Sequence, residues 1–445
     1  MHVLYSLGLL IYFLALLPVL VFRRSRAGKS FGRLGDRLGR VPECVNPGHA
    51  RSVWIHAVSV GEVLAARSLL RDLRETYPTH RLLLSTTTVT GQQVARELGD
   101  AVDGTFYAPV DLPPFVARTL DRAAADLVVF VDTEIWPNWL RACRRRGVKT
   151  LIVNGRISDR SYGRYRFGTW FMRRVFEDVD RVCAQTDAWG RRFVDLGLRA
   201  ERLTVTGSLK FDALDLAATG ADLHVGDRVL RYFSFVHDRT VFVAASTLDG
   251  EDEPVLEAFS YVRETDHDAI LILAPRHPER APQVLASANR RGFETVLRSQ
   301  LTADGSVAAD VVVLDTVGEL ARLYQLATVV FVGGSLVPTG GHNILEPAVF
   351  SKPILFGPHM RNFQEISDLF LRNIAAVQVR TADELQTELL ALLRDPVRRA
   401  SLGAAARALV DANRGARSQT MAVIKDLLPP GAQAREDRQT LRAVP

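Results

Sequence analysis

Residues 333–347 read GGSLVPTGGHNILEP and follow an apolar, β-branched run at 328–332. The run is typical of a buried strand, and the glycine pair Gly333–Gly334 lets backbone N–H groups approach an anion. A second pair, Gly340–Gly341, is expected to open a helix whose unpaired amides favour phosphate or carboxylate. Glu346 in that helix could accept hydrogen bonds from the hydroxyls of a ribose. The stretch therefore predicts a nucleotide-binding turn in a parallel α/β sheet.

Short β-branched runs alternate with helical patterns in both halves of the chain. Strands separated by helices indicate parallel sheets covered on both faces, and 445 residues exceed the usual limit for one core. We therefore predict two Rossmann-like domains that face a central cleft where ligands bind, with the junction in a strand-poor region at 213–239. The predicted strands are 53–58, 81–86, 127–131, 150–154, 181–184 and 203–206, then 241–245, 269–274, 311–314, 329–332 and 353–356.

The N-terminus differs from the rest of the chain. Residues 3–22 are almost uninterruptedly apolar and uncharged, which is long enough for a helix to cross a hydrocarbon core of ~30 Å. Five basic residues follow at 23–33, so the body is expected on the cytoplasmic side. A cleaved signal peptide is the alternative, although its basic cluster should come first. Pro18 could also let the helix lie obliquely in one leaflet.

These patterns divide the chain into four parts. We predict a membrane anchor helix at 1–22, a first domain at 23–215, a second domain at 216–428 and a disordered tail at 429–445.

Charge is spread unevenly, although the net charge is only +6. Residues 141–176 contain eleven Lys or Arg and one acid. This excess fits either attraction to anionic lipid or a site for a phosphorylated, lipid-embedded acceptor, and both interpretations stay open. Nucleic acid is disfavoured because no binding motif accompanies the arginines. The three cysteines are far apart without metal-ligand spacing, which indicates reduced structural thiols.

Polar residues follow the predicted strands of the first half. Glu62 could act as a general base for a hydroxyl, or it could simply favour the first turn of a helix. Asp132 and Glu134 come directly after one strand, where packing alone explains two acids poorly. Arg156 follows the next strand. Lys210 follows the last one and could neutralise a carboxylate or phosphate, or be an ordinary surface lysine.

The second half repeats this arrangement. Ser246 ends its first predicted strand, and Arg276 and His277 follow the second, where they could reach a phosphate or a pyrimidine ring. The loop at 315–319 supplies further backbone amides at a helix start. Together these strand ends predict one nucleotide site.

The order of the motifs SVGE, DTEIWPN, NGRIS, GSLKFD, AST, PRHPER, DTVGEL and GGSLVPTGGHNILEP resembles the 3-deoxy-D-manno-octulosonic acid (Kdo) transferases of lipopolysaccharide synthesis. The resemblance runs to about Phe363 and implies a GT-B fold, with a first domain for the acceptor lipid IV(A) and a second for the donor CMP-Kdo. It implies that Glu62 is the proton acceptor and that Asp132 and Lys210 stabilise the transition state. It also implies that CMP is held by Arg276, His277, Val317, Gly318, Glu319, Asn343, Ile344, Leu345 and Glu346. Further candidates are Glu134, Arg156, Ser246, Gly334 and Gly341.

Two departures from the family pattern matter. The family usually has Glu-Thr-Glu where this chain has Asp132-Thr133-Glu134, so either acid could take the family's acidic role. A His of the family is replaced by Leu248.

The expected reaction is an inverting transfer at the inner membrane. Glu62 would remove a proton from an acceptor hydroxyl as that oxygen attacks the anomeric carbon opposite the leaving CMP. No Asp-x-Asp pair stands beside the predicted nucleotide site, so neither a catalytic metal nor another cofactor is expected. The alternatives are another membrane-anchored GT-B glycosyltransferase, a sugar-nucleotide epimerase, a phosphohydrolase, or a non-catalytic nucleotide- or lipid-binding protein.

Overall fold

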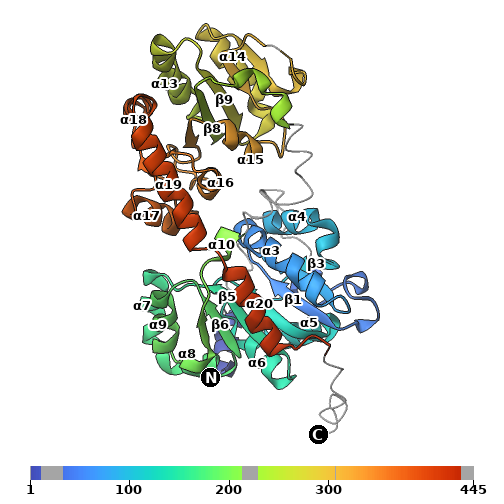
Figure 1. Cartoon of the computed structure of the whole chain (residues 1–445). Helices are drawn as coiled ribbons and strands as arrows, with labels where there is room; N and C mark the ends of the chain where they lie inside the picture. Colours follow the sequence, from blue (N-terminus) through green and yellow to red (C-terminus); the bar gives the residue numbers. More distant parts are fainter. Residues whose placement is uncertain (1, 12–33, 213–228, 306, 432–445) are drawn as a thin grey trace, which may run out of the picture. The chain divides into compact units, whose positions relative to one another are not determined.

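The computed structural model describes residues 2–11, 34–212, 229–305 and 307–431, which form two compact units (Figure 1). Unit 1 is Met1–Ala213 together with Arg414–Pro445, and unit 2 is Leu214–Asn413. Each unit is built on a seven-stranded parallel sheet, so the predicted pair of parallel α/β domains is confirmed.

The sheet of unit 1 has the order β3-β2-β1-β4-β5-β6-β7. Its strands are β1 Ser52–His56, β2 Arg81–Thr86, β3 Gly104–Tyr107, β4 Ala125–Val131, β5 Lys149–Gly155, β6 Arg181–Ala184 and β7 Leu203–Val205. Its helices are α2 Leu34–Arg37, α3 Val60–Thr76, α4 Val89–Glu97, α5 Pro113–Ala123, α6 Pro137–Arg145, α7 Asp159–Phe167, α8 Thr169–Glu177, α9 Asp187–Asp195, α10 Leu209–Asp212 and α20 Ala416–Leu427.

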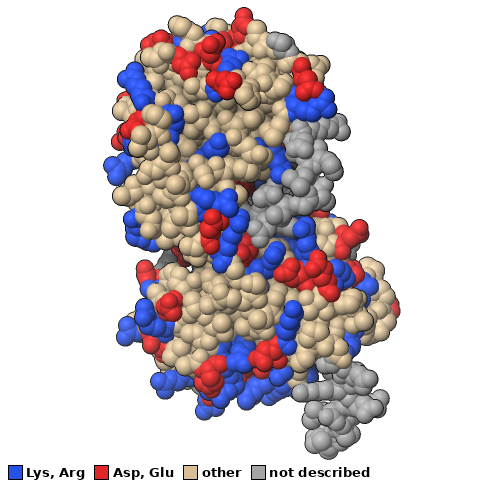
Figure 2. All heavy atoms as spheres, viewed as in Figure 1, with Lys and Arg blue, Asp and Glu red and all other residues tan. Residues whose placement is uncertain are grey.

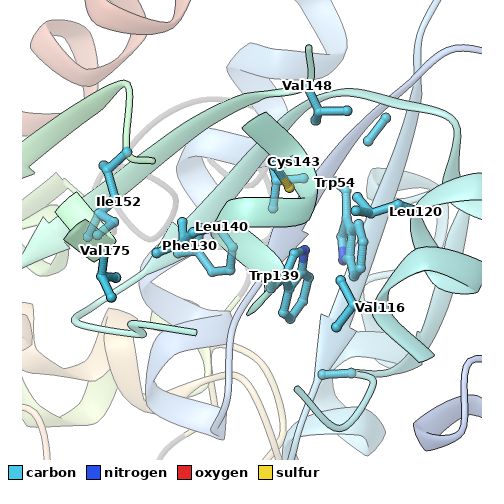
Figure 3. Close-up of a cluster of buried hydrophobic side chains, with 14 of the residues drawn as sticks. Trp54, Val116, Leu120, Phe130, Trp139, Leu140, Cys143, Val148, Ile152 and Val175 are labelled. Atoms are coloured by element: carbon cyan, nitrogen blue, oxygen red, sulfur yellow. The ribbon is translucent and has the colours of Figure 1, made fainter. Parts of the chain in front are cut away.

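Apolar side chains pack on both faces of this sheet because neighbouring strand residues point to opposite sides. On one face Trp54 of β1 packs against Trp139 of α6, with ring centroids 4.4 Å apart, and Phe130 of β4 joins them (Figure 3). On the other face Val53 and Ile55 join a second buried cluster. Buried contacts on both faces therefore hold the strands in place, and the strands position the loops at their carboxyl ends.

The C-terminal helix α20 departs from the predicted division. The predicted second domain at 216–428 includes α20, whereas the helix packs on unit 1. Its residues Met421 and Ile424 join the same buried cluster as β1, and Asp212 of α10 accepts hydrogen bonds from the N–H groups of Gly415 and Arg417 at 2.9 and 2.6 Å. The apolar face of α20 is therefore part of the core of unit 1.

The predicted anchor is described only in part. Residues 2–11 are helical, and residues 12–22 lie outside the described residues. Among the helices that the structure describes, none is long and apolar enough to span a bilayer. One side of the 2–11 helix packs on unit 1: Asn138 Nδ2 donates to Ser6 Oγ at 2.9 Å, and the Tyr5 ring lies 5.9 Å from Phe171.

The sheet of unit 2 has the order β10-β11-β9-β8-β12-β13-β14. Its strands are β8 Val241–Thr247, β9 Ile270–Pro275, β10 Thr295–Leu297, β11 Val311–Val313, β12 Val329–Val332, β13 Ile354–Phe356 and β14 Val377–Gln378. Its helices are α13 Asp252–Thr265, α14 Ala281–Arg290, α15 Leu320–Leu323, α16 Leu345–Val349, α17 Gln364–Arg372, α18 Ala382–Arg394 and α19 Pro396–Ala412.

All eleven predicted strands are present, and three strands were not predicted. The missed strands β3, β10 and β14 lie at sheet edges and have four residues or fewer. An edge strand pairs on one side only, so it needs neither the length nor the apolar run of a central strand. The predicted junction at 213–239 lies partly outside the described residues, as does most of the predicted tail.

Candidate functional site

Glu62 lies in the first turn of α3, directly after the carboxyl end of β1. Its Oε2 accepts a hydrogen bond from the Val58 N–H at 2.6 Å, and its Oε1 accepts one from Ser59 Oγ at 2.9 Å. Burial raises the pKa of Glu62 to about 7, with a further increase from the charge of Asp132. A carboxyl that titrates near neutral pH can exchange a proton with a substrate, which is what a general base requires.

Asp132 follows β4 in a left-handed conformation, with φ of 61°, and Asn154 at the end of β5 has φ of 56°. This region is unfavourable for residues other than glycine. Asn154 Nδ2 donates a hydrogen bond to Asp132 Oδ1, and Arg156 NH2 lies 3.4 Å from Asp132 Oδ2. The left-handed conformations of Asp132 and Asn154 therefore bring the carboxylate of one and the amide of the other into contact at the ends of the neighbouring strands β4 and β5.

Glu134 belongs to the same group of acids. Burial raises the pKa of Glu134 to about 8, with smaller increases from the charges of Glu62 and Asp132. The charges of the two carboxyls interact, so Glu62 and Glu134 titrate as a pair well above the ordinary glutamate range. The site thus holds two acids that can exchange protons near neutral pH.

Lys210 lies in the short helix α10. The Leu209 N–H donates to Asn154 Oδ1 at 3.1 Å, so α10 begins at the side chain that also holds Asp132. The structure therefore brings Glu62, Asp132, Glu134 and Arg156 together and attaches the turn of Lys210 to them. Asn154 is the residue that links these parts, and its place at the end of the predicted strand 150–154 was the signal for it.

In unit 2 the first glycine pair has a different function from the predicted one. The amides of Gly334, Ser335 and Leu336 donate to the carboxylate of Glu251 at 2.6, 2.9 and 2.9 Å. The prediction that these amides face a ligand is wrong, because a fully buried side chain of the protein supplies the anion. Gly333 is needed for close approach, since a Cβ there would lie 2.8 Å from Ser246 O.

The second glycine pair also differs from expectation. The helix α16 begins at Leu345, after Gly340 and Gly341, which have φ of 110° and 74°. The Gly341 N–H donates to Gly334 O at 2.7 Å, so the loop closes on itself and does not present a helix start. A Cβ on Gly334 would lie 2.8 Å from the ring of His342, which therefore rests on the backbone of this loop.

His342 was not among the candidate residues, although it stands in the quoted stretch. Its pKa is lowered to about 4, first by burial and then by the positive charge of Arg276 and of His277. The ring is therefore neutral at physiological pH. Since Arg276 and His277 follow β9, the structure brings these predicted nucleotide ligands close to the loop after β12.

Asn343 and Glu346 form one polar pair beside Arg276. Asn343 Nδ2 donates to Glu346 Oε1 at 3.2 Å, and the Leu345 N–H donates to Asn343 Oδ1 at 3.1 Å. Burial raises the pKa of Glu346, whereas the hydrogen bond from Asn343 and the charge of Arg276 lower it. The predicted cluster of Arg276, His277, Asn343 and Glu346 is thus assembled within unit 2.

Other predicted donor ligands are engaged with the protein. Ile344 and Leu345 are fully buried, so only their backbones are available to a ligand. The carboxylate of Glu319 accepts from Arg298 NH2 at 2.8 Å and from Thr316 Oγ1 at 2.6 Å. The predicted role of Glu319 is therefore restricted to its backbone, while the adjoining Val317 is 84% exposed and Gly318 has φ of 89°. Ser246, a further candidate, has φ of 55° at the end of β8.

The described residues hold no group of three or more His, Cys, Asp or Glu side chains that could bind a metal ion.

Comparison with known proteins agrees with the arrangement of motifs. Residues 32–213 match the family model described as 3-deoxy-D-manno-octulosonic-acid transferase (kdotransferase). The 3-deoxy-D-manno-octulosonic acid transferase of Haemophilus influenzae is 33% identical over 94% of this chain and 96% of its own length. That of Bordetella pertussis is 34% identical over 89% of this chain and 91% of its own length. Among solved structures, UDP-GlcNAc 2-epimerase from Neisseria meningitidis shares the fold, with a TM-score of 0.57 and 10% identity over 85% of this chain and 99% of that one.

Proposed function

We propose a specific reaction for this chain, which belongs to the family of 3-deoxy-D-manno-octulosonic acid (Kdo) transferases and is a glycosyltransferase. The protein moves Kdo from CMP-Kdo to the lipid A precursor lipid IV(A). The transfer inverts the anomeric centre, and Glu62 is the general base. The observation that carries this proposal is the half-buried Glu62 carboxyl at the carboxyl end of β1, with a pKa of about 7.

Unit 1 provides the groups that act on the acceptor. Glu62 takes the proton of a sugar hydroxyl as the oxygen of that hydroxyl bonds to the anomeric carbon and the bond to CMP breaks. The hydrogen bonds from Val58 N–H and Ser59 Oγ fix the carboxylate in one orientation. Asp132 is the acid that takes the family's stabilising role, because its contact with Arg156 keeps a charge pair beside the reacting oxygen. Lys210 supplies a second positive charge from α10.

Unit 2 provides the groups that hold the donor. Arg276 and His277 lie beside neutral His342, and the positive charge there suits the phosphate of CMP. Asn343 and Glu346 present an amide and a carboxyl that suit the hydroxyls of a ribose. CMP is a good leaving group once its phosphate is held by cations, so the proposed reaction uses no metal and no cofactor.

We further propose that the protein works at the cytoplasmic face of the inner membrane. The 2–11 helix exposes one apolar stripe, formed by Val3, Leu4, Leu7, Leu10 and Ile11. Phe171 links the covered side of this helix to Trp170, with ring centroids of Tyr5 and Phe171 5.9 Å apart and of Trp170 and Phe171 6.1 Å apart. Phe167 is 92% exposed and Trp170 is 61% exposed, so the apolar surface continues to the junction of α7 and α8.

Basic residues accompany this apolar surface. Figure 2 shows Lys and Arg side chains gathered at the end of unit 1 where Figure 1 places α8 and the N-terminus. Among the described side chains of α6, α7 and α8, the exposed arginines are Arg144, Arg145, Arg164, Arg166, Arg173 and Arg174. Apolar side chains among exposed cations are the combination that binds anionic bilayers, in which the acceptor lipid is embedded.

The test of the proposed reaction is an incubation of the detergent-solubilised protein with lipid IV(A) and CMP-Kdo in the presence of EDTA. Mass spectrometry of the lipid should show added Kdo. Glu62→Gln should reduce kcat by about 10²–10⁴-fold while CMP binding is retained. The matched control is Glu75→Gln, which changes an exposed acid near the other end of α3. Equal turnover by Glu62→Gln and by the wild type would remove Glu62 as the base.

A further inference from the structure

Two neighbouring acids, Glu251 and Asp252, lie at the start of α13, which follows the central strand β8. In the sheet, β8 lies between β9 and β12. The loop after β9 carries Arg276 and His277, and the loop after β12 leads to the segment from His342 to Glu346. The start of α13 is therefore flanked by the two loops from which the donor site is built.

Glu251 holds the loop after β12. Its carboxylate is fully buried and accepts hydrogen bonds from four backbone N–H groups. Three come from residues 334–336, at 2.6, 2.9 and 2.9 Å, and the fourth comes from Leu248 at 2.9 Å. A buried carboxylate is stable only when its oxygens are paired, so this contact fixes the path of the loop closely.

Asp252 holds the turn after β9. Its Oδ1 accepts from Thr247 Oγ1 at 2.7 Å, and its Oδ2 pairs with Arg280. The side chains of Asp252 and Arg280 are only 10% and 15% exposed, so this ion pair is shielded from solvent. The Arg276 N–H donates to Thr247 O at 2.9 Å, which ties the first residue of the turn to the same place.

We propose that Glu251 and Asp252 are positioning residues that together set the distance between the two loops of the donor site. Successive residues at a helix start point about 100° apart, so one dipeptide can reach a loop on each side. Any rotation of α13 would then move both loops. The proposal rests on the proposed function only for the identity of the donor, because the contacts themselves lie within unit 2.

The first test measures the loops directly by hydrogen exchange with mass spectrometry on the full chain. Glu251→Gln should speed amide exchange at 334–336, because Gln offers one acceptor oxygen where the carboxylate offers two. Asp252→Asn should speed exchange at 276–280. Glu253→Gln, the next acid of α13, pairs with Arg291 on the surface and should leave both loops unchanged. A uniform increase over all of unit 2 would show a general structural role and overturn the proposal.

The second test measures the ligand, with CMP as the probe. Both variants should weaken CMP binding about tenfold to hundredfold. They should raise KM for CMP-Kdo without changing KM for lipid IV(A). Thr247→Val, which removes only the hydroxyl bonded to Asp252, is the milder variant if Asp252→Asn does not fold, and a smaller loss in CMP affinity is expected.

The outcomes separate the two proposals. If the loops exchange faster in Glu251→Gln and Asp252→Asn but the wild-type protein does not bind CMP, the donor assignment is wrong and the positioning role stands. If the wild-type protein binds CMP and Glu251→Gln, Asp252→Asn and Thr247→Val bind it with the same affinity, the positioning role alone is overturned.

Discussion

Asn154 donates a hydrogen bond from its side-chain amide to the carboxylate of Asp132, and both residues hold left-handed backbone conformations at the ends of neighbouring strands. Strained backbone of this kind persists only where surrounding contacts fix it, and it gathers at functional sites. Asn154 also accepts the N–H of Leu209, so one side chain connects Asp132 to the start of α10. The position of Lys210 relative to the acids depends on this residue.

Replacing Asn154 should separate strain from hydrogen bonding. Asn154→Ala puts a residue that adopts the left-handed region less readily than Asn at this position, at a cost of about 1 kcal/mol, and leaves the buried Leu209 N–H without its acceptor, so the free energy of unfolding should fall by about 2–4 kcal/mol. Asn154→Gly relieves the strain and should be about 1 kcal/mol more stable than Asn154→Ala. Both variants should lose activity to a similar extent. Urea unfolding measures the changes in stability, and initial rates measure the loss of activity. Full activity in either variant would contradict this account.

The pH dependence of turnover should report Glu62. Since the base must be deprotonated and its pKa is about 7, kcat/KM should fall as the pH drops below about 7 and not near the ordinary glutamate value. The pKa of Glu134 is also raised, to about 8, and its charge interacts with that of Glu62. Glu134→Gln should therefore keep the acidic limb, with its midpoint at the same or a lower pH, because a like charge beside Glu62 is removed. A midpoint near 4.5 in the wild type would argue against Glu62 as the base.

The C-terminal helix should stabilise unit 1 and not unit 2. Ile424 of α20 is fully buried in the core cluster that includes β1, so Ile424→Ala should cost about 2–5 kcal/mol. Hydrogen exchange should accelerate in β1 and β2 and stay unchanged in β8. Asp426→Ala, a change on the same helix, removes a surface ion pair with Arg181 of β6 and should cost less than about 1 kcal/mol. Faster exchange in β8 alone would contradict the assignment of α20 to unit 1.

Gly334 should be intolerant of any side chain. Its φ is 64°, and a Cβ would lie 2.8 Å from the ring of His342, so Gly334→Ala should displace that ring and weaken CMP binding about tenfold or more. Gly292→Ala is the matched control, because Gly292 also has a positive φ, of 87°, but no atom within 4 Å of the added Cβ. Titration calorimetry with CMP distinguishes the two. Equal binding by both variants would show that the ring does not need this glycine.

The apolar corner of unit 1 should be needed for membrane binding. In sedimentation with vesicles that contain anionic phosphatidylglycerol, the double variant Phe167→Ser with Trp170→Ser should bind more weakly than the wild type, and added salt should weaken both. Tyr261→Ser, at a partly exposed aromatic of unit 2, is the control and should bind normally. Normal binding by the double variant would place the membrane contact elsewhere.

The sequence alone was sufficient for two parallel sheets, for their central strands and for the strand ends that carry polar residues, but not for the order of the strands. A central parallel strand must be an apolar run and a polar turn must follow it, so 127–131 and 329–332 were recognisable without coordinates. The same rule placed Asp132 after one strand and Arg276 after another. Edge strands such as β14 were not predicted, because an edge strand needs neither the length nor the apolar run of a central strand.

Tertiary structure alone decided what each polar group contacts. The amides of residues 334–336 looked open to a ligand until folding brought Glu251, 83 positions earlier than Gly334, into the nest they form. The hydrogen bond from Asn154 to Asp132 and the docking of α20 on unit 1 likewise join residues far apart in the chain. Local periodicity records which face a residue turns to the core, whereas a pairing between distant segments depends on the whole topology and leaves no local pattern.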